Sequence, residues 1–182
     1  MTKFKEAIQI VDSTMNKLGI KYSFISGTAL GLGREGECMP FDVDVDFCVH
    51  TENRPNIENI VNALGLQTIS TMRYGSRLEG IGFDIGNNNW VEMDFLHTRG
   101  DKVWYTAIIN EGIITKVYPK RMWDNLEFIH AYGVKCPVFH PIHEYLRMLY
   151  GEDWKTPNPY YFQQELFRKT EARHYDWDLT ED

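Results

Sequence analysis

Three aspartates stand at every second position of one short segment, and the residues that alternate with them are apolar. The aspartates are Asp42, Asp44 and Asp46, and the apolar residues are Val43, Val45, Phe47 and Val49. A period of two is typical of a β-strand, so we expect the apolar residues to face a core and the carboxylates to share the opposite face. Carboxylates two positions apart lie ~7 Å from one another and repel when ionised. Cations would relieve that repulsion, and hard oxygen ligands suit Mg²⁺ or Mn²⁺, which then hold phosphate oxygens. The segment therefore predicts metal-dependent phosphoryl-transfer chemistry.

Two other interpretations of the acidic segment are less consistent with its neighbours. Asp-x-Asp-x-Asp also opens a calcium-binding EF-hand loop, which needs Gly at its sixth position and Glu at its twelfth. Phe47 and Asn53 occupy those two positions, so the EF-hand is excluded. A solvated acidic face is the second alternative. It is disfavoured because Val43, Val45 and Phe47 require a buried strand beneath the acids.

A glycine-rich segment precedes the acidic one. Residues 22–25 are mostly apolar and predict a short strand, after which Gly27 and Thr28 would open a short helix or turn. A glycine permits close approach of the backbone, and a hydroxyl group with free N–H groups at a helix start can hold a phosphate. We therefore predict that Gly27 and Thr28 take part in binding a phosphate group of a ligand.

The two segments together resemble the signature of the LicD/fukutin family. Residues 27–34 read Gly-Thr-Ala-Leu-Gly-Leu-Gly-Arg, and residues 39–46 read Met-Pro-Phe-Asp-Val-Asp-Val-Asp. Residues 144–157 are similar to the Glu-Tyr-Leu-x-x-x-Tyr-Gly-x-x-Trp-x-x-Pro ending of the family. The resemblance implies a single-domain α+β fold, a nucleotidyltransferase-like mixed β-sheet flanked by helices. Residues 1–157 would form this domain, and residues 158–182 a helical or irregular C-terminal extension packed on it.

The resemblance also implies an activity. Family members move a phospho-alcohol group, phosphocholine or ribitol phosphate, from a CDP-linked donor to a glycan hydroxyl and release CMP. Asp42, Asp44 and Asp46 would hold Mg²⁺ or Mn²⁺, and a late carboxylate would come from the strand expected at residues 90–96. The family has an aspartate in that context, which favours Asp94 over Glu92. Asp94, or Asp42 if it is not a metal ligand, would take the proton from the acceptor hydroxyl.

Basic residues are candidates for contacts with the donor phosphates. Arg34 is the best candidate for a phosphate clamp, because its planar guanidinium matches phosphate geometry. Arg77 is the second candidate, and Arg73 and Arg147 are possible secondary contacts. The histidines His97, His140 and His143 form no recognised zinc set with cysteines.

Charge and composition limit the partners of the chain. The 182 residues carry 19 basic and 26 acidic side chains, a net charge of −7, which argues against nucleic-acid binding. The three cysteines have no paired spacing, and no apolar run approaches the ~20 residues of a membrane span. We therefore expect a reduced, cytoplasmic protein. Two alternatives stay open: transfer of a nucleotidyl group from an NTP to a small molecule or nucleic acid, and a non-catalytic binding module of the same fold.

Hydrophobic periodicity and turn residues predict the remaining elements. A helix is expected at residues 4–18 and another from Pro55 to about Leu64. Gly86 to Asn89 and the segment 110–112 predict turns between strands. The expected strands lie at 67–73, 78–85, 90–97, 103–109 and 113–117, and further helices at 144–150 and 161–172.

Overall fold

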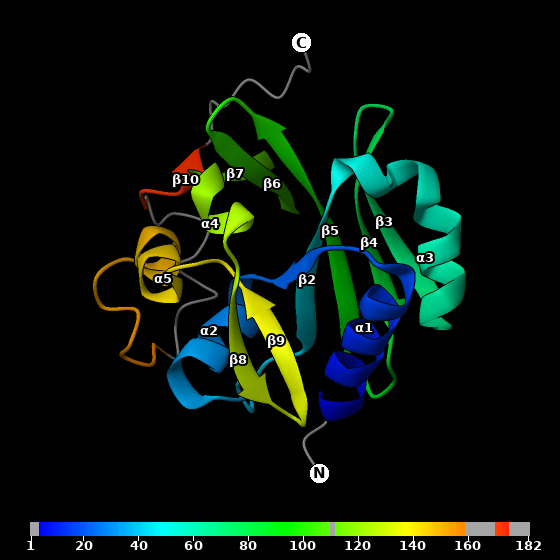
Figure 1. Cartoon of the computed structure of the whole chain (residues 1–182), viewed down its shortest axis with the longest axis horizontal. Coiled ribbons are helices and arrows are strands. Elements are labelled where there is room, and N and C mark those ends of the chain that lie inside the picture. The colour runs from blue at the N-terminus through cyan, green and yellow to red at the C-terminus, as the bar shows by residue number, and fades with distance from the viewer. Residues whose placement is uncertain (1–3, 110–111, 159–169, 175–182) are drawn as a thin grey trace.

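The computed structural model describes residues 4–109, 112–158 and 170–174, and it has an α+β architecture (Figure 1). The helices are α1 (Lys5–Leu18), α2 (Ser26–Glu35), the 3₁₀ helix η1 (Thr51–Asn56), α3 (Ile57–Leu64), α4 (Lys120–Asp124) and α5 (Ile142–Tyr150). The strands are β1 (Tyr22–Phe24), β2 (Asp44–His50), β3 (Gln67–Tyr74), β4 (Arg77–Asp84), β5 (Trp90–Arg99), β6 (Lys102–Ile109), β7 (Gly112–Pro119), β8 (Glu127–Ala131), β9 (Val134–Val138) and β10 (Arg173–His174).

One mixed sheet contains all of these strands. Its order is β10-β7-β6-β5-β2-β1-β9-β8, and β4 also pairs with β5 while β3 pairs with β4. The central strands β2 and β5 are parallel, whereas β1 runs antiparallel to β2. In the view of Figure 1, α1 and α3 lie together on one side of β2 and β5, and α2 and α5 lie on the other. The predicted fold class, a mixed sheet flanked by helices, is confirmed.

The first helix, α1, packs its apolar face into the core. Ile8, Val11 and Met15 recur at spacings of three and four residues and are fully buried. The helix ends at Gly19, whose backbone φ of 66° lies in the left-handed region that glycine adopts without strain. The predicted helix is confirmed, with its first residue at Lys5.

The central strand begins later than the alternation predicts. Val45, Phe47 and Val49 are fully buried, as expected for the core face of a strand. The strand starts at Asp44, however, so Asp42 and Val43 precede it. Val43 is 38% exposed, and the expectation that it faces the core is wrong. The backbone turns at residues 40–41 and only then joins β5, through a hydrogen bond from the Trp90 N–H to the Val43 carbonyl.

Most of the other predicted elements are present with shifted ends. The hairpin turn between β4 and β5 is confirmed, and Asn87 and Asn88 adopt positive φ angles of 56° and 57° there. Pro55 lies inside η1, and the α-helix begins two residues later. Strands β8 and β9 were not expected. Residues 161–169 of the last expected helix lie outside the described residues, whereas Glu171 and Ala172 form a turn.

The described part of the predicted C-terminal extension contributes a strand to the sheet. Strand β10 pairs antiparallel with β7, with Arg173 opposite Lys116. The Ala172 backbone also accepts a hydrogen bond from Val117 and donates one to Met148. The boundary at residue 157 stays a prediction.

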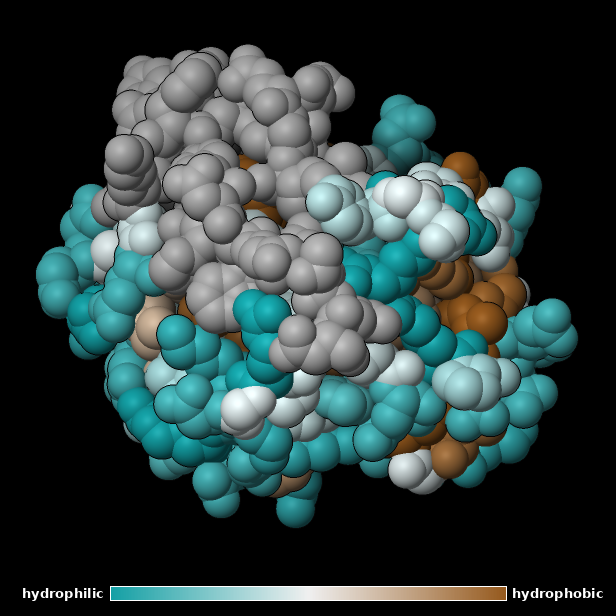
Figure 2. Space-filling model, turned by 90° about the horizontal axis from the view of Figure 1, so that it is seen from above, coloured by the Kyte–Doolittle hydropathy of each residue, from teal (hydrophilic) through white to brown (hydrophobic). Residues whose placement is uncertain are grey.

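One edge of the sheet carries exposed apolar side chains. Seen from above in Figure 2, the surface formed by the described residues is largely hydrophilic, and apolar residues gather at the right-hand edge, the side of α3 and β3 in Figure 1. Strand β3 pairs only with β4 in the described part of the chain, and its Ile69 is 52% exposed. Among the described residues, no helix has the length and apolar character needed to cross a membrane.

Candidate functional site

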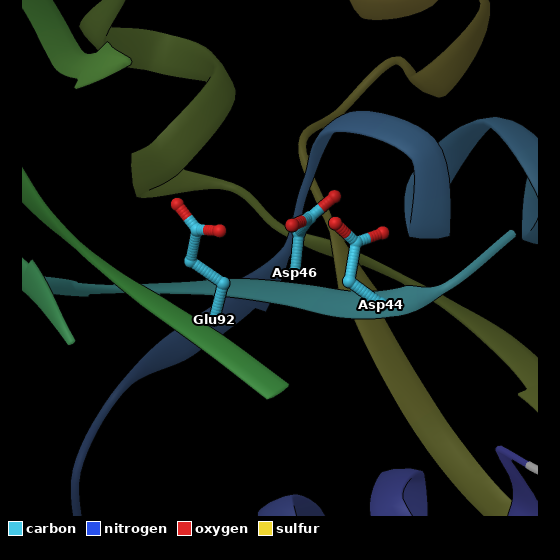
Figure 3. Close-up of side chains that lie close together, drawn as sticks. All are labelled: Asp44, Asp46 and Glu92. Atoms are coloured by element: carbon cyan, nitrogen blue, oxygen red, sulfur yellow. The ribbon is translucent and has the colours of Figure 1, made fainter. Parts of the chain in front are cut away.

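Three carboxylates from β2 and β5 converge on one face of the sheet. The parallel register sets Asp46 opposite Glu92 and Asp44 two pairs earlier, so all three side chains leave the same face. One carboxylate oxygen from each residue lies within 4.8 Å of the others. Figure 3 shows the three groups pointing to the same side of the strands, beside the start of α2. We call Asp44, Asp46 and Glu92 the acidic cluster.

Burial and mutual repulsion oppose ionisation of the acidic cluster. Burial, followed by the charge of Asp42 and a hydrogen bond with it, raises the pKa of Asp44 to about 7. Burial and the neighbouring charges of Asp44, Glu92 and Asp94 raise the pKa of Asp46 well above its usual range. Burial and Asp44 also raise the pKa of Glu92. The fold therefore holds like charges together at the expense of its own stability, as expected where carboxylates serve a chemical role.

The acidic cluster fits a small divalent cation. Oxygen ligands around Mg²⁺ lie at about 2.1 Å from the ion in octahedral geometry, which separates adjacent oxygens by about 3 Å and opposite ones by about 4 Å. The cluster oxygens lie up to 4.8 Å apart, and small side-chain rotations would bring them to these octahedral separations. All three donors are hard oxygens, which favours Mg²⁺ or Mn²⁺ over softer metals.

The stability of the ion-free protein should fall as pH rises. Asp44 has an ordinary pKa of 3.8 and a folded-state pKa of about 7, so the folded protein holds a proton that the unfolded chain has lost. Stability is then highest near pH 4 and declines until about pH 7. Over this interval the carboxyl ionises freely in the unfolded chain, whereas in the folded protein burial and neighbouring charges oppose its ionisation. We expect the urea midpoint in EDTA to decrease over this interval and Mn²⁺ to restore it at pH 7.5. A midpoint that rises with pH in EDTA would contradict the electrostatics described here.

Asp42 lies beside the acidic cluster although it precedes the strand. Its side chain is almost fully buried, and its Oδ1 accepts a hydrogen bond of 3.2 Å from the Val43 N–H. It also shares a hydrogen bond with Asp44. Its other oxygen, Oδ2, packs on Gly27, where an added Cβ would come within 2.9 Å of it. Gly27 thus leaves room for the Asp42 carboxyl, and their roles as donor and metal ligands stay predictions.

Replacing Gly27 by alanine should disturb the acidic cluster through Asp42. The new Cβ has to displace the Asp42 carboxyl, which loosens its hydrogen bond with Asp44. We expect a loss of about 1–3 kcal/mol in stability from overpacking, with Mn²⁺ affinity reduced about tenfold. Gly33→Ala is the matched control on the same helix, because its Cβ meets Leu146 and Ile142 instead. Equal Mn²⁺ affinity of the two variants in calorimetry would contradict a role of Gly27 in placing Asp42.

Thr28 connects α2 to β2. Its fully buried Oγ1 accepts a hydrogen bond of 2.8 Å from the Asp46 N–H, and the Ile25 N–H donates to the Asp46 carbonyl. Both backbone groups of Asp46 are therefore held by the segment that opens α2. The structure gives Thr28 a positioning contact, and the phosphate contact expected from the sequence stays a prediction.

The structure brings Glu92, rather than Asp94, level with Asp46. Asp94 pairs with Cys48 and Gly80, two residues further along β5, and is almost fully buried. Its Oδ1 has no hydrogen-bond partner among the described residues. Burial and the charge of Glu92 raise the pKa of Asp94 well above its usual range. The strand alternation shows that both acids share one face, but only the register between β2 and β5 shows which one meets Asp46. The catalytic assignment of Asp94 stays a prediction.

The two arginines expected at the donor phosphates lie in different surroundings. Arg34 is on the last turn of α2, and its Nε lies 3.5 Å from the Glu35 Oε1. Arg77 forms an ion pair with the fully buried Glu79, which also contacts Arg54 and His97. His97 thus belongs to this buried ion-pair network on β4 and β5. Both phosphate assignments stay predictions.

Lys116 is a residue of the site that no sequence motif predicts. It lies on β7 and is 7% exposed, and its charge lowers the pKa of Asp44, Glu92 and Asp94 against the effect of burial. The signal in the sequence is a single charged residue in a strand that is otherwise mostly apolar, since a buried lysine is rare without a partner.

Two solved structures share the fold. The crystal structure of the lincosamide antibiotic adenylyltransferase LnuA, lincomycin-bound, superposes with a TM-score of 0.50 at 12% identity and covers 74% of this chain and 78% of that chain. The solution structure of the antibiotic-resistance factor ANT(2'')-Ia gives a TM-score of 0.55 at 13% identity, with 98% and 79% covered. At such identities the likeness shows the nucleotidyltransferase fold alone.

Relatives in sequence point to a narrower group. Human ribitol-5-phosphate transferase FKTN is 26% identical over 164 residues, and the mouse protein is 25% identical over 158 residues. Each alignment covers 84% of this chain and 33% of the relative, so the chain spans about a third of the length of these proteins. Residues 19–139, more than half of the chain, match the family described as LicD/FKTN/FKRP, nucleotidyltransferase domain. The resemblance seen in the sequence is confirmed, and the chain belongs to the LicD/FKTN/FKRP nucleotidyltransferase-domain family.

Proposed function

We propose that this domain transfers a phospho-alcohol group from a CDP-linked donor to a hydroxyl of a glycan or sugar and releases CMP. The group would be of the ribitol phosphate or phosphocholine type. The proposal is supported by membership of the family and by the name of its FKTN relatives, ribitol-5-phosphate transferase. The observation that carries it is the convergence of Asp44, Asp46 and Glu92 beside the start of α2.

The acidic cluster would hold Mg²⁺ or Mn²⁺ at the donor. Asp44, Asp46 and Glu92 supply three oxygens, and Asp42 orients Asp44 through their shared hydrogen bond. When bound, the divalent ion offsets the negative charge of the donor diphosphate and of the departing nucleotide. The contacts of Thr28 with Asp46 fix the strand, so the ligand geometry exists before the donor arrives.

A carboxylate of the same face would accept the proton of the acceptor hydroxyl. The acceptor oxygen forms a bond to the phosphorus, and the bond between that phosphorus and the CMP oxygen breaks. Asp94 and Asp42 are the candidate proton acceptors, because both are buried beside the acidic cluster. A raised pKa, as at Asp94, makes a carboxylate a better base at neutral pH than an exposed one.

A comparison of donors tests the reaction class. The protein would be incubated with Mn²⁺, a sugar acceptor and CDP-ribitol, CDP-choline or CTP in parallel. Release of CMP from a CDP-linked donor, lost in EDTA, supports the proposal. Pyrophosphate released from CTP would instead identify a nucleotidyltransferase. Binding of donor without any release would identify a non-catalytic module of the same fold.

A further inference from the structure

Outside the acidic cluster, a group of hydroxyls and one ammonium lies at the start of α2. It is built from four separate elements: Ser26 of α2, Tyr105 of β6, Lys116 of β7 and Tyr145 of α5. The Ser26 Oγ lies 3.2 Å from both the Tyr105 hydroxyl and the Lys116 Nζ. The Tyr145 hydroxyl accepts a hydrogen bond of 2.9 Å from the Ser26 N–H and lies 3.0 Å from the Tyr105 hydroxyl. The ammonium is thus held in place by groups from distant parts of the chain.

The backbone of Ser26 adopts an uncommon conformation. Its φ is 48°, in the left-handed region that residues other than glycine rarely adopt. Two of its groups, the N–H and the hydroxyl, are engaged by side chains of other elements. A non-glycine residue held in such a conformation by its surroundings is typical of functional sites.

The Lys116 ammonium has hydrogen-bonding capacity to spare. An ammonium carries three N–H donors. In the part of the chain that the structure describes, its one hydrogen bond goes to the Ser26 Oγ, and its other contact is with the face of the Tyr105 ring at 5.2 Å. The side chain is only 7% exposed, so bulk water gives little compensation. Two strong donors therefore remain for a ligand that brings oxygen acceptors.

The position of this ammonium indicates what the ligand is. Its charge acts on Asp44, Glu92 and Asp94 through space, without a direct ion pair to them in the described residues. A ligand between Lys116 and a divalent ion on the acidic cluster would meet positive charge from both sides. Phosphate oxygens suit such a position, since their hydrogen bonds to an ammonium are charge-assisted.

We propose that Lys116, held by Ser26, is the protein's own cationic contact for the diphosphate of the donor, opposite the divalent ion on the acidic cluster. Within the proposed function, on which this inference rests, Lys116 positions the phosphate oxygens for attack. Without a divalent ion, the same ammonium partly offsets the acidic cluster. Lys116 therefore favours phosphate binding and opposes metal binding. Removing a lysine with only a structural role would not change these two affinities in opposite directions.

Binding of Mn²⁺ and of inorganic pyrophosphate tests the inference without any turnover. In calorimetry, Lys116→Met should bind Mn²⁺ as tightly as the wild type or more tightly, because a neighbouring positive charge is gone. The Mn²⁺-loaded variant should bind pyrophosphate, and separately CDP, about tenfold or more weakly, because a charge-assisted hydrogen bond is lost. Lys135→Met is the matched control on the exposed face of β9 and should change neither affinity.

A second variant keeps the test decisive if Lys116→Met does not fold. Ser26→Ala removes the acceptor of the Lys116 Nζ but leaves the charge, and should weaken pyrophosphate binding about threefold. Unchanged pyrophosphate affinity in either folded variant, or no pyrophosphate binding by the wild type, overturns the inference. So does parallel weakening of Mn²⁺ and pyrophosphate by Lys116→Met. Lys116-dependent binding without CMP release from any CDP-linked donor would sustain the role of Lys116 and refute the proposed function.

Discussion

Replacing Asp46 by asparagine is expected to abolish transfer while making the ion-free protein more stable. Loss of a metal ligand removes charge stabilisation worth several kcal/mol, and each ~1.4 kcal/mol is a factor of ten in rate. We expect the rate of CMP release to fall about 10³-fold or more. The asparagine side chain cannot ionise, so the repulsion from Asp44, Glu92 and Asp94 that raises the pKa of Asp46 is relieved.

The two effects of Asp46→Asn have to be measured on the same preparation. Urea unfolding in EDTA at pH 7.5 should give a higher midpoint than for the wild type, and Asp44→Asn should behave in the same way. Asp84→Asn is a suitable control, because Asp84 is exposed at the end of β4 and should affect neither rate nor stability strongly. Wild-type activity in Asp46→Asn would refute its assignment as a metal ligand.

The second large effect distinguishes the role of Glu92 in Mn²⁺ binding from that of Asp94. Glu92→Gln should weaken Mn²⁺ binding about 100-fold, because the register places its oxygen within the acidic cluster. Asp94→Asn should change Mn²⁺ affinity about threefold or less and should reduce turnover, since Asp94 lies two residue pairs further along and outside the cluster.

Calorimetric Mn²⁺ titration of these two variants, followed by single-turnover kinetics, measures both effects. The amide replacements keep the size of each side chain, so packing is preserved and only the charge is lost. If Asp94→Asn loses Mn²⁺ binding and Glu92→Gln keeps it, Asp94 rather than Glu92 is the metal ligand on β5. Equal loss in both would assign the two acids to a shared set of ligands.

Local patterns predicted most elements of the fold. The apolar spacing of α1 and the Asn-rich turn between β4 and β5 each reflect physics confined to a few neighbouring residues. Strands β8 and β9 form a hairpin and were missed, because Phe128 of β8 is 59% exposed and β9 ends in three consecutive buried residues. Neither strand therefore shows a regular alternation of buried apolar and exposed polar residues. The start of β2 was placed too early, because the Asp-x-Asp-x-Asp alternation continues through residues 42–43, where the backbone is not yet paired as a strand.

The candidate site was predicted only in part, because local patterns show which residues share a face of one strand but not how separate strands pair. Asp44 and Asp46 share one strand, so their common face follows from alternation alone. The choice between Glu92 and Asp94 depends on the register of two parallel strands, which no local pattern contains. Lys116 reaches the site through the pairing of β6 with β7 and through contact with Ser26, 90 residues away in sequence. Long-range pairing therefore decides which charges meet at the site.

Diffraction from crystals soaked in Mn²⁺ and CDP tests the metal site most directly. We expect an anomalous peak with oxygens of Asp44, Asp46 and Glu92 at about 2.1–2.2 Å from it, and a phosphate oxygen of CDP on the same ion. An absent peak, with the three carboxylates turned away from one another, would contradict metal-dependent transfer at this face of the sheet.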